Sequence, residues 1–421
     1  MMARIYVEGH GCSASHADTE MIAGIVAAGG HQITRSPEGA DLSMLVTCSV
    51  KDPTADRMAH RIRELGRGRL VVAGCLPKAE PGAVERLAGS ASMMGPGAVA
   101  MALEVAESAL AGKRRVELGD AGPKVGLPRI RMNRAISIVE IASGCLSECT
   151  FCQTKLAKGG LKSYRPGDVA AQVEQDVADG CREVWLTSTD NGCYGLDIGT
   201  DLPGLVRRVA AVPGDFMVRV GMMNPMYLPR MASRLLDAMS SPKVFKFLHI
   251  PVQSGSDRVL SEMGRGHTAE TFREVAAEAR EGIGATISTD IIAGFPGETG
   301  ADFAETERLL EEVRPDVVNL SRYSRRPGTE AARRDQLDAA TIKGRSGRLH
   351  GLIRGMTLEA NRGWIGWRGK VIADEAVEGG IRGRNAEYKP IYIRGGAEIG
   401  AWSTVEVVGA TPNALQAVIA S

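Results

Sequence analysis

The sequence predicts an α/β protein in three parts: an N-terminal open parallel α/β domain, a central partial (βα)6 barrel and a small C-terminal all-β barrel. Three observations predict this fold class. Strand-like and helix-like hydrophobic patterns alternate from residue 4 to about residue 330, and only short β patterns follow residue 361. Glycine is abundant, at 51 of 421 residues, while aromatic residues are only 4%. Such a composition suits many tight turns between strands and helices.

The overall composition excludes several classes of protein. Hydrophobic residues make up 44% and charged residues 24%, which is typical of a globular chain and not of a disordered, collagen-like or coiled-coil one. Lysine and arginine number 51 against 50 acidic residues, so any nucleic-acid partner has to be met by a local basic patch. Because the sequence has no apolar run of 18 residues and no apolar leader, we expect no membrane segment, no signal peptide and a cytoplasmic location.

Residues 1–115 read as repeated strand–loop–helix units. Strand patterns at 4–8, 42–47 and 70–73 each end shortly before a cysteine, and helix patterns follow, the first with Asp18 as its expected start and the second at 52–65. Ligands of open parallel sheets bind outside the carboxyl ends of the strands. The cysteines at these ends could therefore converge on one point, although three buried thiols would explain the pattern equally well. These cysteines are Cys12, Cys48 and Cys75.

Residues 116–134 are rich in glycine and proline and are predicted to be a linker. Strand patterns then recur six times within residues 135–357, with helix patterns between them, so we expect parallel strands in a partial barrel. The expected strands are 135–142, 184–188, 217–222, 245–252, 286–293 and 317–323, and a last helix is expected at 336–360. Residues 358–421 carry β patterns at 370–377, 388–393, 404–408 and 417–420, which favour a small barrel.

The strongest motif is a cysteine triplet with the spacing C-x3-C-x2-C, directly after the first strand of the central region. It consists of Cys145, Cys149 and Cys152. Three thiolates in one loop can hold three irons of a four-iron cluster and leave the fourth open. A zinc site completed by a distant fourth ligand is the alternative, but zinc-binding cysteines more commonly occur as two pairs. Of the two remaining cysteines, Cys181 is interpreted as a packing residue. Cys193 lies in the loop after an expected strand end and thus closer to the chemistry, although a structural role is favoured for it.

With this triplet, the sequence resembles the radical S-adenosylmethionine (SAM) superfamily, and over nearly its whole length it resembles the methylthiotransferases of that superfamily. Further family-like runs are Gly11-Cys12 with Asp18, Thr47-Cys48-Ser49-Val50, Gly74-Cys75, residues 249–256, residues 289–299 and residues 326–329. The run Gln153-Thr154-Lys155 and residues 185–195 look like the archaeal and eukaryotic branch. That resemblance implies action on N6-threonylcarbamoyladenosine in tRNA, beside the anticodon.

The resemblance also implies the cofactors. Cys145, Cys149 and Cys152 would hold one 4Fe–4S cluster, and Cys12, Cys48 and Cys75 a second one, with SAM as co-substrate. The implied reaction places a thiomethyl group on C2 of the adenine. This carbon bears no leaving group and no acidic hydrogen, so a SAM-derived radical is the suitable reagent. An electron donor and a sulfur source would be partners besides tRNA.

Two other functions stay open on the sequence. The same chemistry could act on isopentenyladenosine in tRNA or on an aspartate of a ribosomal protein. A non-catalytic iron–sulfur protein that binds RNA is the alternative from a different class.

Four residues are candidates for contacts with SAM. Phe151 lies inside the cysteine loop and could face the adenine of SAM, or could be an ordinary core residue. Ser188, Gln253 and Asp290 stand at expected strand ends, where barrel enzymes bind their ligands. Each of these three could instead cap a helix or satisfy a loop.

Local positive charge favours two RNA-binding segments. Residues 321–354 contain nine lysines and arginines against three acids, although such charge runs are usually solvated helix faces. The C-terminal β module resembles the TRAM domain, which binds RNA, and its basic residues could neutralise phosphates. They are Arg362, Arg368, Lys370, Arg382, Arg384, Lys389 and Arg394.

Overall fold

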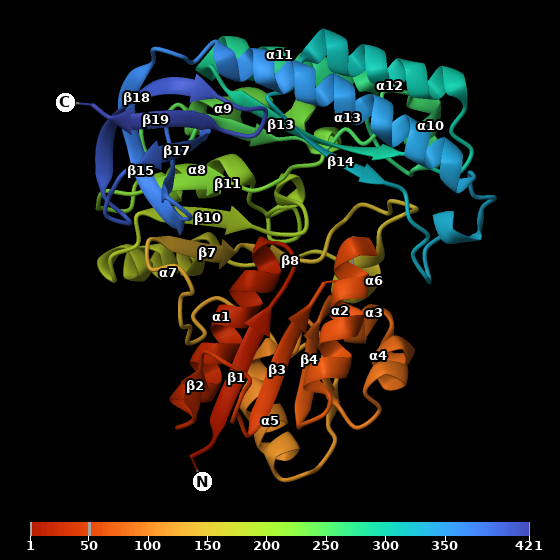
Figure 1. Cartoon of the computed structure of the whole chain (residues 1–421), viewed down its shortest axis with the longest axis vertical. Helices are drawn as coiled ribbons and strands as arrows, with labels where there is room; N and C mark the ends of the chain where they lie inside the picture. The colour runs from red at the N-terminus through yellow and green to blue at the C-terminus, as the bar shows by residue number, and fades with distance from the viewer. Residues whose placement is uncertain (1, 49–51, 421) are drawn as a thin grey trace.

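The computed structural model describes residues 2–48 and 52–420, and Ser49 and Val50 of the Thr47-Cys48-Ser49-Val50 run lie outside this part. In Figure 1 the N-terminal sheet forms the lower half of the molecule, the central barrel lies above it, and the C-terminal barrel flanks the central one. The predicted fold class is confirmed in all three parts. The described residues contain no helix that is both long enough and apolar enough to cross a membrane.

The N-terminal part is one parallel sheet of six strands in the order β2-β1-β3-β4-β5-β6. Helices α1 and α5 cover one face, and α2 and α4 cover the other, each through a separate apolar core. Strands β2, β5 and β6 were not expected from the sequence, because two or three residues are too few to show a period. The elements are β1 (Arg4–Gly9), α1 (Ser13–Ala28), β2 (Gln32–Thr34), β3 (Leu42–Thr47), α2 (Asp52–Leu65), β4 (Leu70–Gly74), α3 (Cys75–Ala79), α4 (Pro81–Leu87), β5 (Ser92–Met94), α5 (Ala102–Leu110) and β6 (Val116–Glu117).

The expected start of the first helix at Asp18 is wrong. Helix α1 begins at Ser13, directly after Cys12, and Asp18 is a buried residue in its second turn. An aspartate at a helix start normally accepts a hydrogen bond from a backbone N–H. Asp18 instead pairs with the buried Lys124, at 2.6 Å, so tertiary structure and not capping explains this aspartate.

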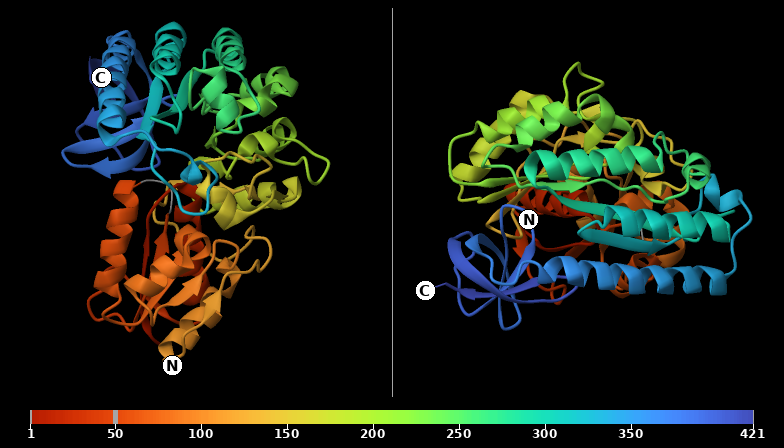
Figure 2. Two further views of the ribbon diagram at one scale, coloured as in Figure 1. Left: turned by 90° about the vertical axis from the view of Figure 1, so that its right-hand side faces the viewer. Right: turned by 90° about the horizontal axis from the view of Figure 1, so that it is seen from above.

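The central part contains the six predicted parallel strands, arranged as two sheets of three. The strand orders are β11-β10-β7 and β12-β13-β14. A single parallel β-bridge between Val218 and Val244 links β11 to the segment before β12, and so links the two sheets. The helices lie outside this open ring (Figure 2). The strands are β7 (Ile136–Glu140), β10 (Glu183–Thr187), β11 (Met217–Val220), β12 (Phe247–His249), β13 (Thr286–Ala293) and β14 (Val317–Arg322).

Two short strands, eight α-helices and three short 3₁₀ helices complete this part among the described residues. The 3₁₀ helices are Asn191–Cys193, Pro225–Arg230 and Ala331–Arg333. The last helix, α13, is the longest, and it runs beside β14 to the C-terminal barrel (Figure 2). These elements are β8 (Ala142–Ser143), β9 (Lys162–Ser163), α6 (Gln153–Lys158), α7 (Pro166–Ala178), α8 (Leu202–Ala210), α9 (Ala232–Met239), α10 (Asp257–Glu262), α11 (Ala269–Ile283), α12 (Gly300–Val313) and α13 (Ala339–Arg362).

The C-terminal part is a closed five-stranded barrel in the order β15-β16-β17-β19-β18. It is packed against the central part through a shared apolar cluster in which the ring of Tyr388 lies 4.7 Å from that of Phe245 and 4.9 Å from that of Phe247. Strand β16 was not expected, because two glycines and two arginines hide its alternation. The strands are β15 (Arg368–Val377), β16 (Gly380–Arg384), β17 (Pro390–Arg394), β18 (Trp402–Ala410) and β19 (Leu415–Ile419).

The segment predicted as a linker lies against the first helix. The backbone N–H of Ile130 donates to the carbonyl of Glu20, at 2.9 Å, and that of Met132 donates to the Glu20 carboxylate, also at 2.9 Å. Burial raises the pKa of Glu20 to about 7, despite the hydrogen bond from Met132. The domain boundaries expected from the sequence remain a prediction, but this segment is structured by its contacts.

Replacing Glu20 by glutamine is expected to remove a pH dependence of stability. The folded protein holds a proton on Glu20 up to about pH 7, whereas the unfolded chain releases it near pH 4.5. Stability from this group is therefore present at acid pH and is lost as the pH rises to 7, by about 3 kcal/mol in all. Glutamine keeps the acceptor for Met132, so Glu20→Gln should gain stability over wild type between pH 5 and pH 8. Urea midpoints across this range measure the gain, and Glu107→Gln, on an exposed position of α5, is the control.

Candidate functional site

The N-terminal cysteine triad, Cys12, Cys48 and Cys75, gathers at the carboxyl edge of the first sheet. Cys48 and Cys75 directly follow Thr47 and Gly74, which are register partners of β3 and β4. The loop with Cys12 passes so close that a Cβ on Gly11 would lie 2.6 Å from the Cβ of Cys48. Gly11 also has a φ of 126°, so both its conformation and its surroundings favour glycine. The convergence expected from the sequence is thus confirmed.

The surroundings of this triad act on the thiol of Cys75 in two opposing ways. Burial raises the pKa of Cys75 to about 12, with the nearby Cys12 and Cys48 adding to the effect, while the charge of Lys158 opposes it. Lys158 thus favours the thiolate form of Cys75. Each cysteine of the chain is among the described residues and is free, so none of these three is used in a disulfide.

The second group is the cysteine loop, residues 145–152, between β8 and α6. Gly144 has a φ of 73°, and a Cβ there would lie 1.9 Å from the carbonyl oxygen of Gly160, so this turn requires glycine. Arg265 donates from Nη1 to the sulfur of Cys149, at 3.5 Å, and the backbone N–H of Ser147 donates to the sulfur of Cys145, at 3.2 Å. Both contacts stabilise negative charge on sulfur.

Cys193, which the sequence placed near the chemistry with a structural role favoured, belongs to the surroundings of this loop. The sulfur of Cys145 lies within 4.8 Å of both Cys193 and Asp190, and all three residues are buried. A hydrogen bond from Cys193 lowers the pKa of Cys145 to about 6. Burial raises the pKa of Asp190 to about 7, and the proximity of Cys145 adds to this. In the sequence, Asp190 stands out only as part of the run 185–195, which looks like the archaeal and eukaryotic branch. Its contact with Cys145 depends on how the loop after β10 folds.

Helices α3 and α6 connect the two cysteine groups. Cys75 begins α3, Cys152 precedes α6, and these two helices pack against each other. Gln153 donates to the carboxylate of Glu80, at 2.6 Å, across the same contact. The first sheet and the central barrel therefore present their cysteines to one region.

A buried network of four charged residues supports this arrangement. Lys124 pairs with Asp18 at 2.6 Å and with Glu140 at 2.8 Å, and Lys158 pairs with Glu140 at 2.9 Å. Burial alone would raise the pKa of Glu140, but the two lysines outweigh it and hold the pKa at about 2. The network joins α1, the segment before β7, β7 itself and α6. It therefore ties the N-terminal sheet to the helix that follows the cysteine loop.

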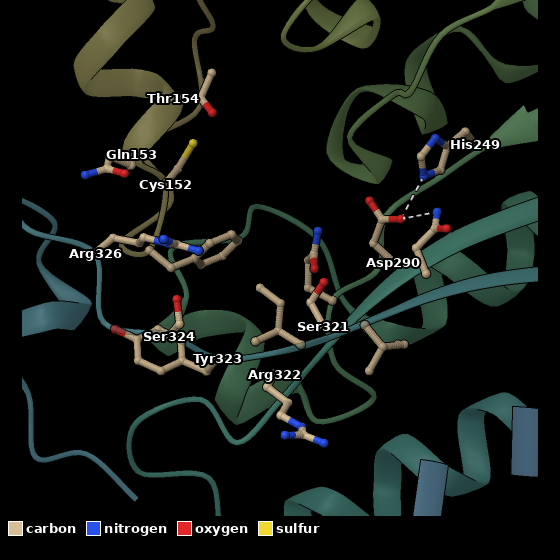
Figure 3. A pocket seen from close by; sticks show the side chains of 15 residues that line it. Cys152, Gln153, Thr154, His249, Asp290, Ser321, Arg322, Tyr323, Ser324 and Arg326 are labelled. Carbon is tan, nitrogen blue, oxygen red and sulfur yellow. Dashed lines mark hydrogen bonds and ion pairs between the residues drawn. The ribbon is translucent and has the colours of Figure 1, made fainter. Parts of the chain in front are cut away.

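A cavity of about 380 Å³ opens beside the cysteine loop, at the carboxyl ends of β13 and β14 (Figure 3). Asp290 is central in it: its Oδ1 contacts Nε2 of His249 at 2.9 Å and accepts a hydrogen bond from Asn319 at 2.7 Å. Phe151, Phe295 and Tyr323 form an aromatic cluster at the same end of the barrel. The cavity thus combines a polar array with an apolar wall that limits the entry of water.

Three of the four predicted SAM contacts line this cavity. Phe151 lines the cavity and also packs edge-on against Phe295, with ring centres 6.4 Å apart. Its position therefore suits both a contact with SAM and an ordinary packing role. Asp290 and Gln253 line it as well. Gln253 has a φ of 74°, a left-handed conformation that is rare outside glycine and common at functional positions. The structure does not bring Ser188 into the cavity, because its hydroxyl donates to Asn191 instead.

Several lining residues had no signal in the sequence. Asn319 and Ser321 lie on β14 and face the cavity, but isolated polar residues in a strand pattern are not distinctive. Arg265, which contacts Cys149, stands 113 positions after the cysteine loop ends at residue 152. Only the folding of α10 against the loop brings it there.

The two basic segments are less available to RNA than their sequences suggested. Lys389, counted among the RNA-binding residues, is buried and pairs with Asp316 at 2.6 Å, so that expectation is wrong for this residue. Arg384 is held by Asp374 at 3.1 Å, and Arg345 by Glu298 at 2.5 Å. Exposed basic residues remain on both segments, namely Arg333, Lys343, Arg354, Arg362, Lys370 and Arg394.

The donor sets fit two iron–sulfur clusters. Each site offers three thiols, basic residues near sulfur and no disulfide, and three thiolates leave one iron of four without a protein ligand. The cysteine loop adjoins a cavity large enough for a small co-substrate, through Cys152 and Phe151.

Replacing Cys145, Cys149 and Cys152 together by alanine is expected to leave about half of the iron. Wild type should hold about eight irons per chain after anaerobic reconstitution, four at each site. The triads lie on different sheets, so the loss of one should spare the other. Iron analysis measures this, with Cys181→Ala as a control that keeps both sites. Complete loss of iron in the triple variant would show that the triads do not act independently.

Comparison with known proteins agrees with this geometry. Residues 139–310 match the model of the Radical SAM superfamily, and residues 4–95 match that of an uncharacterized protein family, UPF0004. A probable threonylcarbamoyladenosine tRNA methylthiotransferase of Pyrococcus horikoshii is 39% identical to this chain. The alignment covers 93% of this chain and 94% of the length of that relative. The threonylcarbamoyladenosine tRNA methylthiotransferase of Drosophila melanogaster is 38% identical over 93% of this chain and 72% of its own.

Solved structures show the same fold at low identity. The radical SAM methyltransferase TsrM of Kitasatospora setae, with cobalamin and a 4Fe–4S cluster bound, has a TM-score of 0.60 and 15% identity over 79% of this chain and 77% of its own. The cobalamin-dependent radical SAM enzyme OxsB has a TM-score of 0.55 and 11% identity over 83% of this chain and 56% of its own. These likenesses concern the fold alone.

The open barrel with its cysteine loop and adjoining cavity defines a radical SAM protein. Given the identity to its relatives over nearly its full length, the chain belongs to the family of threonylcarbamoyladenosine tRNA methylthiotransferases. Members of this family use SAM and iron–sulfur clusters, as the resemblance of the sequence implied.

Proposed function

We propose that this protein inserts a thiomethyl group at C2 of N6-threonylcarbamoyladenosine, next to the anticodon of tRNA. One observation carries the proposal: two cysteine triads from separate sheets meet across the α3–α6 contact, in a chain of this family. Two cluster sites so close together suit a reaction that needs both a radical and a held sulfur atom. When bound, the clusters and SAM supply these two functions.

In this proposal Cys145, Cys149 and Cys152 hold one cluster, and Cys12, Cys48 and Cys75 hold the other. The protein's own residues position the co-substrate. Asp290 is fixed by two hydrogen bonds and presents its carboxylate to the cavity beside Cys152.

Neighbouring side chains control charge and water. Arg265 places positive charge beside Cys149, and Lys158 does so for Cys75. The cluster of Phe151, Phe295 and Tyr323 shields the cavity from water, which protects reactive intermediates.

The partners follow from the same chemistry. The reaction consumes electrons and sulfur, so an electron donor and a sulfur source act together with tRNA, in the cytoplasm. Arg333, Lys343, Arg354, Arg362, Lys370 and Arg394 supply the exposed positive charge for phosphates.

Nucleoside mass analysis of tRNA from a deletion strain tests the proposal. The expected result is loss of the thiomethylated form of threonylcarbamoyladenosine and accumulation of its unthiolated precursor, with restoration by the intact gene. Loss of a thiomethylated isopentenyladenosine, or of a modified aspartate in a ribosomal protein, would instead assign one of the alternative substrates. Absence of 5′-deoxyadenosine from a reduced, reconstituted sample would favour a non-catalytic RNA-binding role.

A further inference from the structure

A second cavity, of about 460 Å³, adjoins the one beside the cysteine loop. His249 and Asn319 line both cavities, so the Asp290 array forms the partition between them. The second cavity lies between the inner face of the central barrel and the C-terminal barrel, which contributes Arg384 and Tyr388. The two cavities thus form one interior region that extends from the cysteine loop to the C-terminal barrel.

The second cavity contains a cation without a paired anion. Two of its three basic residues are neutralised: Arg384 pairs with Asp374 at 3.1 Å and Lys389 pairs with Asp316 at 2.6 Å. The third is Arg219 on β11, whose buried Nε has no hydrogen-bond partner among the described residues. No ion pair of Arg219 with a described carboxylate is present either. A half-buried guanidinium without an anion is costly unless a ligand supplies one.

Aromatic rings hold this guanidinium in place. Its central carbon lies 5.3 Å from the ring centre of Trp185, 5.5 Å from that of Phe247 and 5.5 Å from that of Tyr388. Rings interact with the faces of a guanidinium and leave its N–H edges available for a planar anion. Tyr388 has a φ of 61°, an uncommon conformation for a bulky residue that marks this part of the C-terminal barrel as constrained.

The acid nearest along the sheet is a weak partner for Arg219. Glu183 lies on β10, two residues before Trp185, the register partner of Arg219, and it accepts a hydrogen bond from the Trp185 ring. Burial raises the pKa of Glu183 to about 7, with Asp374 adding to the effect. Glu183 is therefore protonated in a large part of the molecules at neutral pH. Asp374 is engaged by Arg384, so the positive charge of Arg219 is left for a ligand.

We propose that Arg219 binds the carboxylate of the threonylcarbamoyl group of the substrate nucleoside, an inference that rests on the proposed function. C2 and C6 are the two neighbours of N1 in the adenine ring, so the C2–H bond and the N6 substituent point in diverging directions. If C2 faces the cavity beside Cys152, the substituent extends past His249 into the second cavity. Phe247 and His249 are two residues apart on β12, a separation of about 7 Å, which a carbamoyl-threonine group can span. Arginine binds a carboxylate through two parallel hydrogen bonds, so Arg219 would select the modified nucleoside over plain adenosine.

Binding of three anticodon stem-loop RNAs to the anaerobically reconstituted protein tests this inference. One carries threonylcarbamoyladenosine, one carries the same group with its carboxylate converted to a carboxamide, and one carries adenosine. Wild type is expected to bind the carboxylate form about ten- to a hundredfold more tightly than the carboxamide form. Arg219→Gln is expected to bind both forms alike, and Arg219→Lys to keep part of the preference. Arg230→Gln, at an exposed arginine, is the control that retains the wild-type ratio.

The outcomes separate this inference from the proposed function. Equal binding of carboxylate and carboxamide forms by wild type would overturn the inference, and this comparison needs no variant to fold. A full preference in Arg219→Gln would overturn it too, because another group would then recognise the carboxylate. Failure of the proposed function would look different: the deletion strain would keep its thiomethylated threonylcarbamoyladenosine. Iron content and thermal midpoints of the variants confirm that they are intact.

Discussion

Cys75→Ala is expected to abolish thiomethyl insertion while cleavage of SAM to 5′-deoxyadenosine continues near the wild-type rate. Cys75 belongs to the N-terminal triad on the first sheet, whereas SAM is expected beside Cys152 in the central barrel. The proposal assigns sulfur holding to the first site and radical formation to the second, so removing one ligand of the first should separate the two activities. The measurement is the yield of thiomethylated nucleoside and of 5′-deoxyadenosine from the same reaction.

Cys12→Ala should behave as Cys75→Ala does, since both residues belong to one triad. Cys181→Ala is the matched control, because its sulfur is buried and donates to the carbonyl of Glu183, at 3.0 Å, away from both cysteine groups. This control should keep both products. A normal yield of thiomethylated nucleoside from Cys75→Ala would refute the assignment of the N-terminal triad.

Lys124→Met is expected to destabilise the protein by about 3–5 kcal/mol, which is typical when one member of a buried ion pair is removed. Lys124 and Lys158 balance Asp18 and Glu140 in a network that is almost fully buried. Without Lys124 the network keeps two carboxylates and one ammonium, and Asp18 loses its ion-pair partner. The urea midpoint, measured at equal iron content, reports the loss.

Two further variants make this prediction specific. Lys162→Met removes an exposed lysine that pairs with Asp120, and exposed pairs contribute at most about 1 kcal/mol. Adding Asp18→Asn to Lys124→Met restores the charge balance and should recover part of the lost stability. Equal effects of Lys124→Met and Lys162→Met would show that the buried network does not stabilise the contact between the N-terminal sheet and the barrel.

Much of the fold was predictable because its patterns are local. All six strands of the central barrel were expected, and each overlaps the observed strand, since buried parallel strands are continuous apolar runs bounded by polar loops. The missed strands β2, β5, β6 and β16 are short or glycine-rich, so their own residues show no period. The start of α1 was misplaced because Asp18 looks like a cap, and its true partner, Lys124, is 106 residues away.

By itself, the sequence determined the fold class and the placement of six cysteines, three within one loop and three that each follow a strand. These features depend on the spacing of residues along a strand or within one loop. That spacing is a local property of the chain and does not depend on tertiary contacts. Only the tertiary structure decided that α3 and α6 bring the two groups together, that Ser188 lies outside the cavity, and that Lys389 is buried against Asp316. It also decided that Arg219 is the cation without an anion, framed by rings from β10, β12 and the C-terminal barrel. Charge pairing depends on distances of a few ångströms between residues far apart in the chain, and no local pattern records those distances.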